Sequence, residues 1–419
     1  MIYSKPTIHR FTNFSSPLPM RLTLENGIPF IGLHNADLTL VRLDIRLMAG
    51  SCFQQKPSAA AAALKLITEG TSLLSAEEIV EQLDYFGSYF EVMDDRDFST
   101  FTVYFPQSAA TEILHIIKQL FDDAVFPQEK IGIYKNNSKK KLAINLEKTS
   151  YLSHLRFIET IFGEKHPYGF SLKLSDIDAL TREDIVQFYD KNFHAGNMRV
   201  FAAGNLDDSF QQLLNSTIGQ LHRKEANVSA FVPAQPQTNC CYVERENAVQ
   251  SSICIGRTWF NRTHKDWIPT TVLNTVLGAY FGSRLMTNIR EEKGLAYGIH
   301  SRVTSFLQDG MFLICADVNK NQVRQAADEI YKELLRLTQE EIPAQELSLV
   351  KNYLYGFFLR NFDGLFSQIE HFIISDDYHF EDTYWKTCLE SFKDINATTL
   401  LSLANTYLHP DDMTEMVVG

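Results

Sequence analysis

Two stretches of this sequence determine its fold: LTREDIVQFYDKNFHAGNMRVFAAG at residues 180–204 and INATTLLSLANTYLHPDDMTEMVVG at residues 395–419. They align without a gap at an offset of 215 residues (395 − 180), which brings His194 opposite His409. Both segments share a pattern of apolar positions and predict a helix, a loop and a strand in the same order. The sequence therefore predicts an internal duplication. A period of this length indicates two homologous α/β domains rather than a solenoid of short repeats.

Composition limits the class of protein. The chain has 419 residues, with 39 basic and 51 acidic side chains and a formal net charge of -12. Its length suggests two or three domains, and the acidic balance argues against a nucleic-acid-binding protein, which normally carries a basic face. No apolar run is long enough to span a membrane, and the first residues, MIYSKPTIHRF, lack the apolar segment of a secretory signal. We therefore expect a cytoplasmic protein with no membrane partner.

The six cysteines form no C-x-x-C pair. In a large chain without a secretory signal, structural thiols are expected rather than disulfides or a metal site. Cys240 and Cys254 lie in strand-like runs, which predicts that both are small buried hydrophobic residues.

The first half is predicted to begin with a β-hairpin, because Asn26-Gly27 is the preferred sequence of a two-residue type I′ turn. Residues 41–47 alternate apolar and polar side chains, which predicts a strand with one buried face and one wet face. Ser75 and Glu78 form a capping box at the start of a helix. Further helices are expected over 58–68, from 108, over 128–162 and from 181, and further strands over 89–93, 99–105 and 198–203.

Residues 221–239 lose this periodicity and carry Pro233 and Pro236, which indicates a linker. The predicted organisation is an N-terminal domain over residues 1–220, this linker, and a C-terminal domain over residues 240–419. The C-terminal domain is expected to hold strands over 240–244, 251–257, 299–304 and 311–316, helices from 266 and 283, and a largely helical end. The predicted fold class is α+β, with two homologous α/β domains that each contain a mostly antiparallel or mixed sheet flanked by helices.

The sequence has no H-E-x-x-H or H-x-x-E-H motif, no nucleophile elbow and no phosphate-binding loop. His222 and Glu225 offer only two ligands, which cannot fix a tetrahedral zinc ion. The segment HFIISDDYH at residues 371–379 contains two histidines and two aspartates, but SDDY predicts a helix break between the histidines. A structural role is therefore favoured for this segment, since zinc sites need convergent ligands.

The segment NIREEKGLAYGIHS, residues 288–301, places Arg290 near a helix end and Tyr297 at the start of a strand, across a turn at Gly294. A permanent cation and a phenol can both donate hydrogen bonds to a polarised carbonyl or an oxyanion. On the local pattern alone, a surface ion pair for the arginine and packing of the tyrosine on a sheet are the simpler explanation.

This segment resembles the second-domain signature of the insulinase, or pitrilysin, family of zinc peptidases. NADLTLVRLDIRLMAGS at residues 35–51 and EGTSLLSAEEIVEQLDYFGSYF at residues 69–90 resemble the first strands and helices of that family. KHPYG at residues 165–169 and the segment after it resemble the end of its first domain. The resemblance covers nearly the whole chain and implies a metalloendopeptidase-like fold of tandem homologous α/β domains.

The sequence departs from this family at the metal site. In catalytic members an H-x-x-E-H motif precedes a Gly-Thr step, which is Gly70-Thr71 here, and a glutamate ligand follows much later. The four corresponding positions hold Ala61, Leu64, Lys65 and Lys141. Alanine and leucine have no lone pairs to offer, and an ammonium group repels zinc. We therefore expect no metal or other cofactor in this chain.

The resemblance implies a non-catalytic subunit of a heterodimeric peptidase, inactive alone. A zinc-motif-bearing homologous subunit would supply zinc, while Arg290 and Tyr297 would contact the peptide substrate and stabilise the oxyanion. The peptide would bind as a strand added to a sheet edge, and the net charge suits cationic peptides as a loose preference.

Two alternatives remain: a catalytically inactive homodimeric protein that binds peptides or acts as a scaffold, and a hydrolase with an unrecognised site in residues 371–379. The run Lys139, Lys140 and Lys141 is predicted to be a solvated helix face. The alternative for this run is a position in the vacated metal pocket or against an acidic partner.

Overall fold

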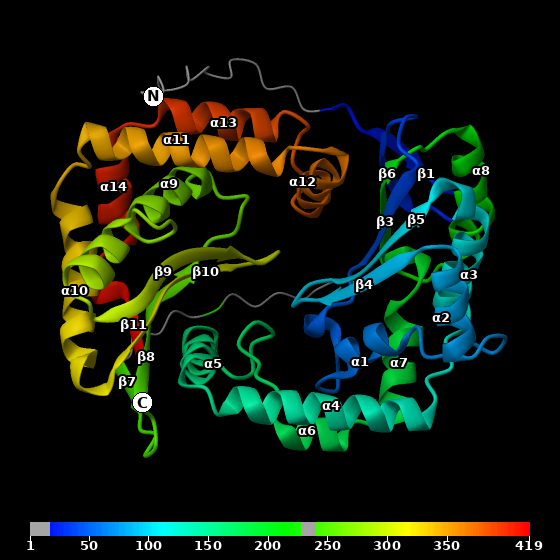
Figure 1. Ribbon diagram of the computed structural model, residues 1–419, viewed down its shortest axis with the longest axis horizontal. Coiled ribbons are helices and arrows are strands. Elements are labelled where there is room, and N and C mark those ends of the chain that lie inside the picture. Colours follow the sequence, from blue (N-terminus) through cyan, green and yellow to red (C-terminus); the bar gives the residue numbers. More distant parts are fainter. Residues whose placement is uncertain (1–16, 228–233, 235–239) are drawn as a thin grey trace, which may run out of the picture.

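The structure is a computed structural model that describes residues 17–227, 234 and 240–419. It contains two sheets, one in each half of the chain (Figure 1). The predicted absence of a secretory signal concerns residues outside the described part, as does most of the predicted linker. Among the described residues, no helix combines the length and the apolar character needed to cross a membrane.

The sheet of the first half has six strands in the order β1-β2-β6-β3-β5-β4. Their bounds are β1 Met20–Thr23, β2 Pro29–His34, β3 Leu40–Leu47, β4 Tyr89–Asp94, β5 Ser99–Pro106 and β6 Met198–Gly204. The pairing of β2 with β6 is parallel and the other pairings are antiparallel. The sheet is therefore mixed, as the sequence predicted.

The sheet of the second half repeats this topology with the order β7-β11-β8-β10-β9. Its bounds are β7 Cys240–Val243, β8 Gln250–Trp259, β9 Ala296–Ser305, β10 Gly310–Asn319 and β11 Thr414–Val418. These five strands correspond in order to β2-β6-β3-β5-β4, and the parallel pair, β7 with β11, occupies the matching place. The matching topology supports the predicted duplication.

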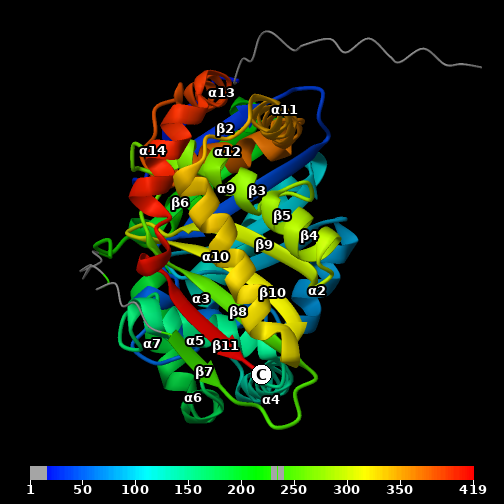
Figure 2. The same cartoon turned by 90° about the vertical axis from the view of Figure 1, so that its left-hand side faces the viewer.

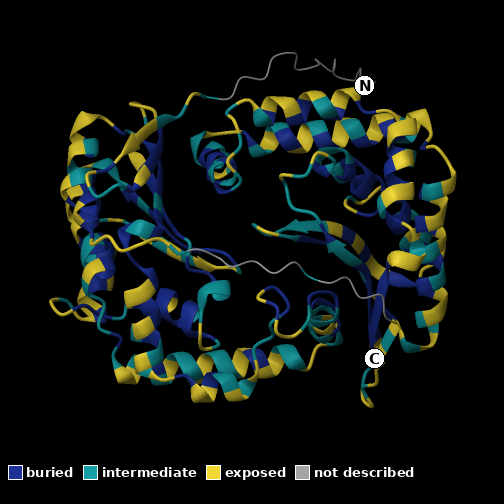
Figure 3. Ribbon diagram, turned by 180° about the vertical axis from the view of Figure 1, so that it is seen from behind, coloured by how far each residue is buried: buried dark blue, intermediate teal, exposed yellow. Residues whose placement is uncertain are grey.

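Helices pack on both sheets. In the first half they are α1 Ala59–Leu66, α2 Ala76–Tyr85, α3 Ala110–Asp123, α4 Gln128–Leu146, α5 Thr149–Phe162, α6 Leu174–Ala179, α7 Arg182–Asn192 and α8 Asp208–Ser216. In the second half they are α9 Trp267–Leu277, α10 Val323–Gln339, α11 Ala344–Asn361, α12 Leu365–Asp377, α13 Tyr384–Asp394 and α14 Ala397–Tyr407, with a π-helix at Met286–Glu292. The capping box of Ser75 and Glu78 at α2 is present as predicted. Figure 3 shows that inner strands such as β3, β6 and β10 are largely buried, whereas the outer helices carry exposed residues.

The duplication extends to single hydrogen bonds. Helices α7 and α14 begin 215 residues apart (397 − 182) and have the same length. After α7, the His194 side chain accepts a hydrogen bond from the backbone N–H of Gly196. After α14, His409 does the same for Asp411. The aligned histidines therefore cap equivalent short turns in front of equivalent strands.

Each half lends one helix to the sheet of the other half (Figures 1 and 2). Helix α5 packs against β8 and β11, on the face of the second sheet opposite α10. Helix α12, which ends 215 residues after α5 (377 − 162), packs against β2 and β6 of the first sheet. Buried apolar clusters form at both contacts, one including Phe157 and Cys254 and the other including Phe201 and Phe372.

This exchange overturns the prediction of a wet face on the strand at residues 41–47. Arg42, Asp44 and Arg46 of β3 are all buried. The Arg46 guanidinium donates to the two carboxylate oxygens of Asp377 in α12, at 3.0 and 2.7 Å. The period-two pattern identified the strand correctly, but the helix that covers its polar face comes from a distant part of the sequence.

The predicted type I′ turn at Asn26-Gly27 is wrong. Such a turn needs a positive φ at both residues, but only Gly27 has one, at 82°. The hairpin closes instead with a longer loop, in which the Gly27 N–H donates to the Leu24 carbonyl at 2.7 Å. The Asn26 side chain donates to the carbonyl groups of Ile218 and Leu221, at 2.9 and 3.0 Å. These bonds fix the loop against the end of the first half.

Two further predictions need correction, and one is confirmed. Cys254 is buried as predicted, but Cys240 is exposed because it lies on the edge strand β7. The predicted helix break at SDDY is confirmed, since α12 ends at Asp377 and His379 follows with a φ of 55°. The start of the predicted linker belongs to the first half, because Leu221 is buried in its core and Asn227 donates to Met48 and Asn192.

Candidate functional site

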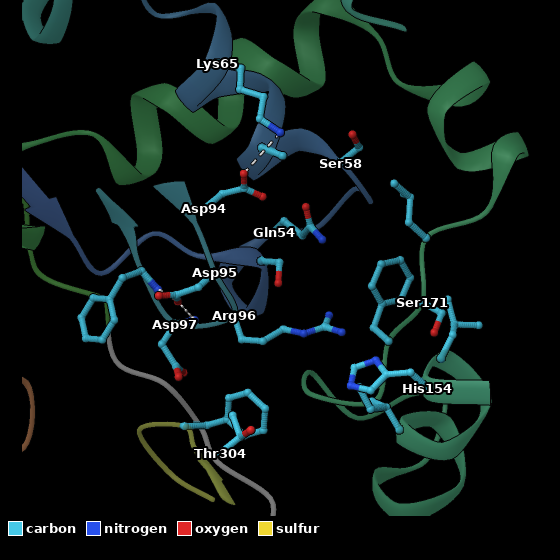
Figure 4. A pocket seen from close by; sticks show the side chains of 18 of the residues that line it. Gln54, Ser58, Lys65, Asp94, Asp95, Arg96, Asp97, His154, Ser171 and Thr304 are labelled. Atoms are coloured by element: carbon cyan, nitrogen blue, oxygen red, sulfur yellow. Dashed lines mark hydrogen bonds and ion pairs between the residues drawn. The ribbon is translucent and has the colours of Figure 1, made fainter. Parts of the chain in front are cut away.

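A cavity of about 700 Å³ lies where α1, α4 and α5 of the first half meet the β9–β10 turn of the second half. Figure 4 shows the side chains that line it. The β4–β5 turn, with Asp95, Arg96 and Asp97, forms another wall. The cavity therefore draws on both halves of the chain.

Three of the four replaced positions of the metal motif line this cavity: Ala61, Lys65 and Lys141. The fourth, Leu64, is fully buried in the core of the first half. The Lys65 ammonium lies 3.4 Å from a carboxylate oxygen of Asp94. Within the described residues, no group of three or more His, Cys, Asp or Glu side chains is arranged to hold a metal ion. The absence of zinc from this chain stays a prediction.

The lysine run divides between two environments. Lys141 lines the cavity, whereas Lys139 forms an ion pair with Asp178 at 2.7 Å. Lys140 is exposed and does not line this cavity. Of the three lysines, only Lys141 lies in the vacated metal pocket, which was the alternative to a solvated helix face.

Asp97 joins the two halves at the rim of the cavity. Its carboxylate accepts hydrogen bonds from the Tyr168 hydroxyl, at 2.7 Å, and from the Leu307 backbone N–H, at 3.0 Å. Burial raises the pKa of Asp97 to about 6, although both hydrogen bonds act in the opposite direction. Tyr168 also stacks on Phe306, with ring centroids 4.5 Å apart. No sequence pattern predicted this contact, although Tyr168 lies in the KHPYG segment.

Arg290 and Tyr297 lie as the sequence predicted. Arg290 is part of the π-helix, Gly294 turns the chain with a φ of 60°, and Tyr297 follows at the start of β9. Single π-turns of this kind occur often at functional sites. The Tyr297 side chain is 89% exposed. The Arg290 guanidinium carbon lies 5.2 Å from the centroid of the Tyr297 ring and 5.0 Å from that of Phe281.

This geometry differs from the simpler explanation of the two residues. Tyr297 is not packed on the sheet, and Arg290 makes no ion pair with any described residue. Arg290 instead contacts two aromatic rings and holds them beside each other by cation–π contact. The pair therefore presents a phenol and a guanidinium to the surface.

A second cavity of about 660 Å³ lies beside Tyr297, between α5 and the sheet of the second half. Residues of β9 and β10 line it, including His300, Arg302 and Cys315. His154 of α5 lines both cavities. The exposed tyrosine and the replaced ligand positions thus lie on two cavities that share a wall.

His154 is a neutral acceptor at this shared wall. An Arg302 guanidinium nitrogen lies 2.7 Å from its Nε2 atom. Burial lowers the pKa of His154 to about 4, and the cations Arg302 and Arg96 act in the same direction. The imidazole is therefore uncharged at neutral pH and accepts the hydrogen bond of the guanidinium. Sequence patterns did not single out His154, Arg302 or Arg96.

Residues 371–379 connect the halves. The carboxylate of Asp376 accepts from Arg199 at 2.8 Å, and that of Asp377 pairs with Arg46. The ring of His371 packs against Phe362, with centroids 3.8 Å apart. Both carboxylates are thus engaged by arginines of the first sheet.

Comparisons with known proteins agree with this architecture. Residues 179–354 match the family model described as the Peptidase M16 inactive domain. An uncharacterized zinc protease, YmxG, of Bacillus subtilis is 23% identical over 80% of this chain and 82% of its own length. A probable inactive metalloprotease of the same organism, YmfF, is 21% identical over 58% of each chain.

Solved structures show the same fold. The peptidase M16 inactive domain from Pseudomonas fluorescens superposes with a TM-score of 0.89, at 19% identity, over 96% of this chain and 98% of that one. A protease from Helicobacter pylori gives a TM-score of 0.86, at 18% identity, over 96% of this chain and 100% of that one.

Fold and site together define a duplicated α/β protein of the metallopeptidase type with lysines and apolar residues at the metal-ligand positions. Residues 179–354 correspond to the inactive domain of the M16, or insulinase/pitrilysin, family of peptidases, which confirms the resemblance predicted from the sequence.

Proposed function

We propose that this chain is the non-zinc-binding subunit of an M16 peptidase, inactive alone, that acts in the cytoplasm. The exposure of Tyr297 carries the proposal. A tyrosine that is 89% exposed beside a stacked arginine has no role in the packing of its own chain. At the same time, lysines or apolar residues occupy all four positions of the motif that provide zinc ligands and the general base in catalytic relatives.

The partner in this proposal is a homologous subunit that carries H-x-x-E-H and supplies zinc and an activated water. The Tyr297 hydroxyl would donate a hydrogen bond to the oxygen that gains negative charge when the peptide carbonyl is attacked. The Arg290 guanidinium would bind a neighbouring substrate carbonyl, and its contact with the ring orients Tyr297. Loss of one such donor typically lowers the rate about a hundredfold or more.

An open sheet edge adjoins Tyr297. Strand β9 pairs with β10 on one side and, within the described residues, with no strand on the other. An extended peptide can add to such an edge through backbone hydrogen bonds. The strand that carries Tyr297 would thus also hold the substrate main chain.

The test mixes this chain with a homologous zinc-motif subunit and measures cleavage of a fluorogenic peptide. We expect activity only in the mixture, and a loss of about a hundredfold with Tyr297→Phe. Tyr85→Phe is the matched control, because Tyr85 is 84% exposed on α2, away from both cavities. Activity that Tyr297→Phe leaves unchanged would refute the complementing role.

The second candidate is a homodimeric protein that binds peptides or acts as a scaffold. It is favoured by an exposed apolar stripe on α11, formed by Leu349, Tyr353 and Phe357. Exposed aromatic surface of this kind is enriched in subunit interfaces. Sedimentation of the purified chain decides between the candidates, since a stable dimer without activity in any mixture supports the second one.

A further inference from the structure

Two cationic side chains at the first cavity have no counter-ion among the described residues. Figure 4 shows Arg96 extending from the β4–β5 turn into the cavity. In the part of the chain that the structure describes, no carboxylate lies within ion-pair distance of Arg96 or Lys141, although both line the cavity. The Arg302 guanidinium in the second cavity contacts the neutral His154 and forms no ion pair with any residue that the structure describes.

The carboxylates of the first cavity, in contrast, are engaged. Asp94 pairs with Lys65, and Asp377 pairs with Arg46. Asp97 accepts two hydrogen bonds from Tyr168 and Leu307. Asp95 accepts hydrogen bonds from the backbone N–H groups of Asp97 and Phe98, at 2.7 and 2.6 Å. The acidic groups are thus committed to the protein itself, while guanidinium and ammonium groups remain open to a ligand.

The second cavity shows the same imbalance. Its one acidic lining residue, Asp317, accepts a hydrogen bond from Ser252. Arg302 contacts His154, which lines the wall between the two cavities. His154 stays neutral there because burial and the neighbouring cations lower its pKa. An anion placed at this wall would face Arg96 on one side and Arg302 on the other.

We propose that the two cavities bind an extended peptide through a carboxylate group, held by Arg96 and Lys141 in the first cavity, with Arg302 as the second contact point. An arginine matches the two oxygens of a carboxylate, and charged hydrogen bonds of this kind are among the strongest in proteins. The carboxylate comes from the C-terminus of the peptide or from an acidic side chain. This ligand is opposite in charge to the one that the net charge of -12 favours.

The inference goes beyond the proposed function, because the site needs neither zinc nor a partner subunit. It assigns to the isolated chain the recognition of acidic peptides in the pocket that would hold the metal of a catalytic relative. A failure of peptide binding would leave the role of Tyr297 in a mixed complex untouched, since that role is measured by cleavage.

The experiment measures binding of three fluorescein-labelled octapeptides to the full chain by fluorescence anisotropy. The first has uncharged side chains and a free C-terminal carboxylate, the second is its C-terminal amide, and the third is an amide with one internal glutamate. We expect the first or the third to bind at least about tenfold more tightly than the second, and more weakly as salt is added. The stronger of the two identifies the source of the carboxylate.

Variants assign the site. Arg96→Gln and Lys141→Gln are each expected to weaken binding of the preferred peptide about tenfold. Lys140→Gln is the matched control, because it removes the same charge one residue away from Lys141 and outside the cavity. Because Lys141 is exposed, we expect Lys141→Gln to fold even if Arg96→Gln does not. Equal binding of all three peptides, or no effect of Lys141→Gln, would overturn the proposal.

Discussion

The buried ion pair between Arg46 and Asp377 gives the sharpest prediction, because a second ion pair between the same halves serves as its control. The side chains of Arg46 and Asp377 are 9% and 5% exposed, and the bond is bidentate. Arg21 and Asp382 also join β1 to the second half, at 2.6 Å, but they are 46% and 40% exposed. The two pairs thus differ mainly in burial.

Asp377→Asn leaves the Arg46 guanidinium buried without its counter-ion, and Arg199 lies only 3.5 Å from the same carboxylate. Breaking a buried ion pair costs about 3–5 kcal/mol, whereas an exposed pair contributes about 0–1 kcal/mol. For 419 residues the unfolding entropy is about 0.9 kcal/mol per kelvin. We therefore expect the melting temperature to fall by about 3–6 °C in Asp377→Asn and by about 1 °C or less in Asp382→Asn.

The assay is thermal unfolding followed by circular dichroism, with urea unfolding as a check. A second unfolding transition in the melting curve of Asp377→Asn would show that the two halves unfold separately, as expected if this ion pair couples them. Burial raises the pKa of Asp377 although Arg46 lowers it, so the pair carries a large desolvation cost. The double change Arg46→Met with Asp377→Leu is therefore expected to recover most of the loss. Equal shifts for Asp377→Asn and Asp382→Asn would refute the reasoning.

Three further predictions concern the cavities and the second sheet. Burial raises the pKa of Asp97 to about 6, so the fold favours its neutral form. Stability relative to Asp97→Asn should therefore decline by roughly 2 kcal/mol as the pH rises from 4 to 7. Urea unfolding at several pH values measures this decline, and parallel pH profiles of the two proteins would contradict it. The Sγ atoms of Cys254 and Cys315 lie 3.4 Å apart on adjacent strands, so hydrogen peroxide should oxidise the two thiols to a disulfide while the peroxide is reduced to water. Peptide mapping should find the two cysteines joined, with a loss of 2 Da, and Cys388, which is buried elsewhere, is the internal control. Elemental analysis of the purified chain should find no stoichiometric zinc, because Ala61 and Lys141 offer no ligand, and one zinc per chain would overturn this.

Local patterns predicted most elements, because strands and helices depend on near neighbours. The capping box at Ser75 and the turn at Gly294 needed only a few adjacent residues. The predicted placement of Arg290 and Tyr297 was correct for the same reason, since they lie on either side of one short turn. The type I′ turn failed because Asn26 bonds a segment almost two hundred residues away.

The cavities were out of reach of such patterns. Arg96, His154 and Arg302 come from three elements whose spacing in the sequence has no regularity. What brings them together is the exchange of α5 and α12 between the halves, together with the contact of the two hairpin turns at Asp97. Whether Arg96 or Lys141 has a counter-ion depends on which carboxylates other donors have already engaged.

The sequence alone determined the duplication, the family resemblance and the replacement of the metal ligands, because each of these depends only on residue identity and local spacing. The tertiary structure decided which surfaces are covered. The polar face of β3 is buried because α12 lies on it, and Tyr297 is exposed because nothing in the described chain packs over it. Burial and ion pairing depend on distant contacts: α12 supplies Asp377 as the counter-ion of Arg46, whereas no carboxylate of the described residues lies within ion-pair distance of Arg96.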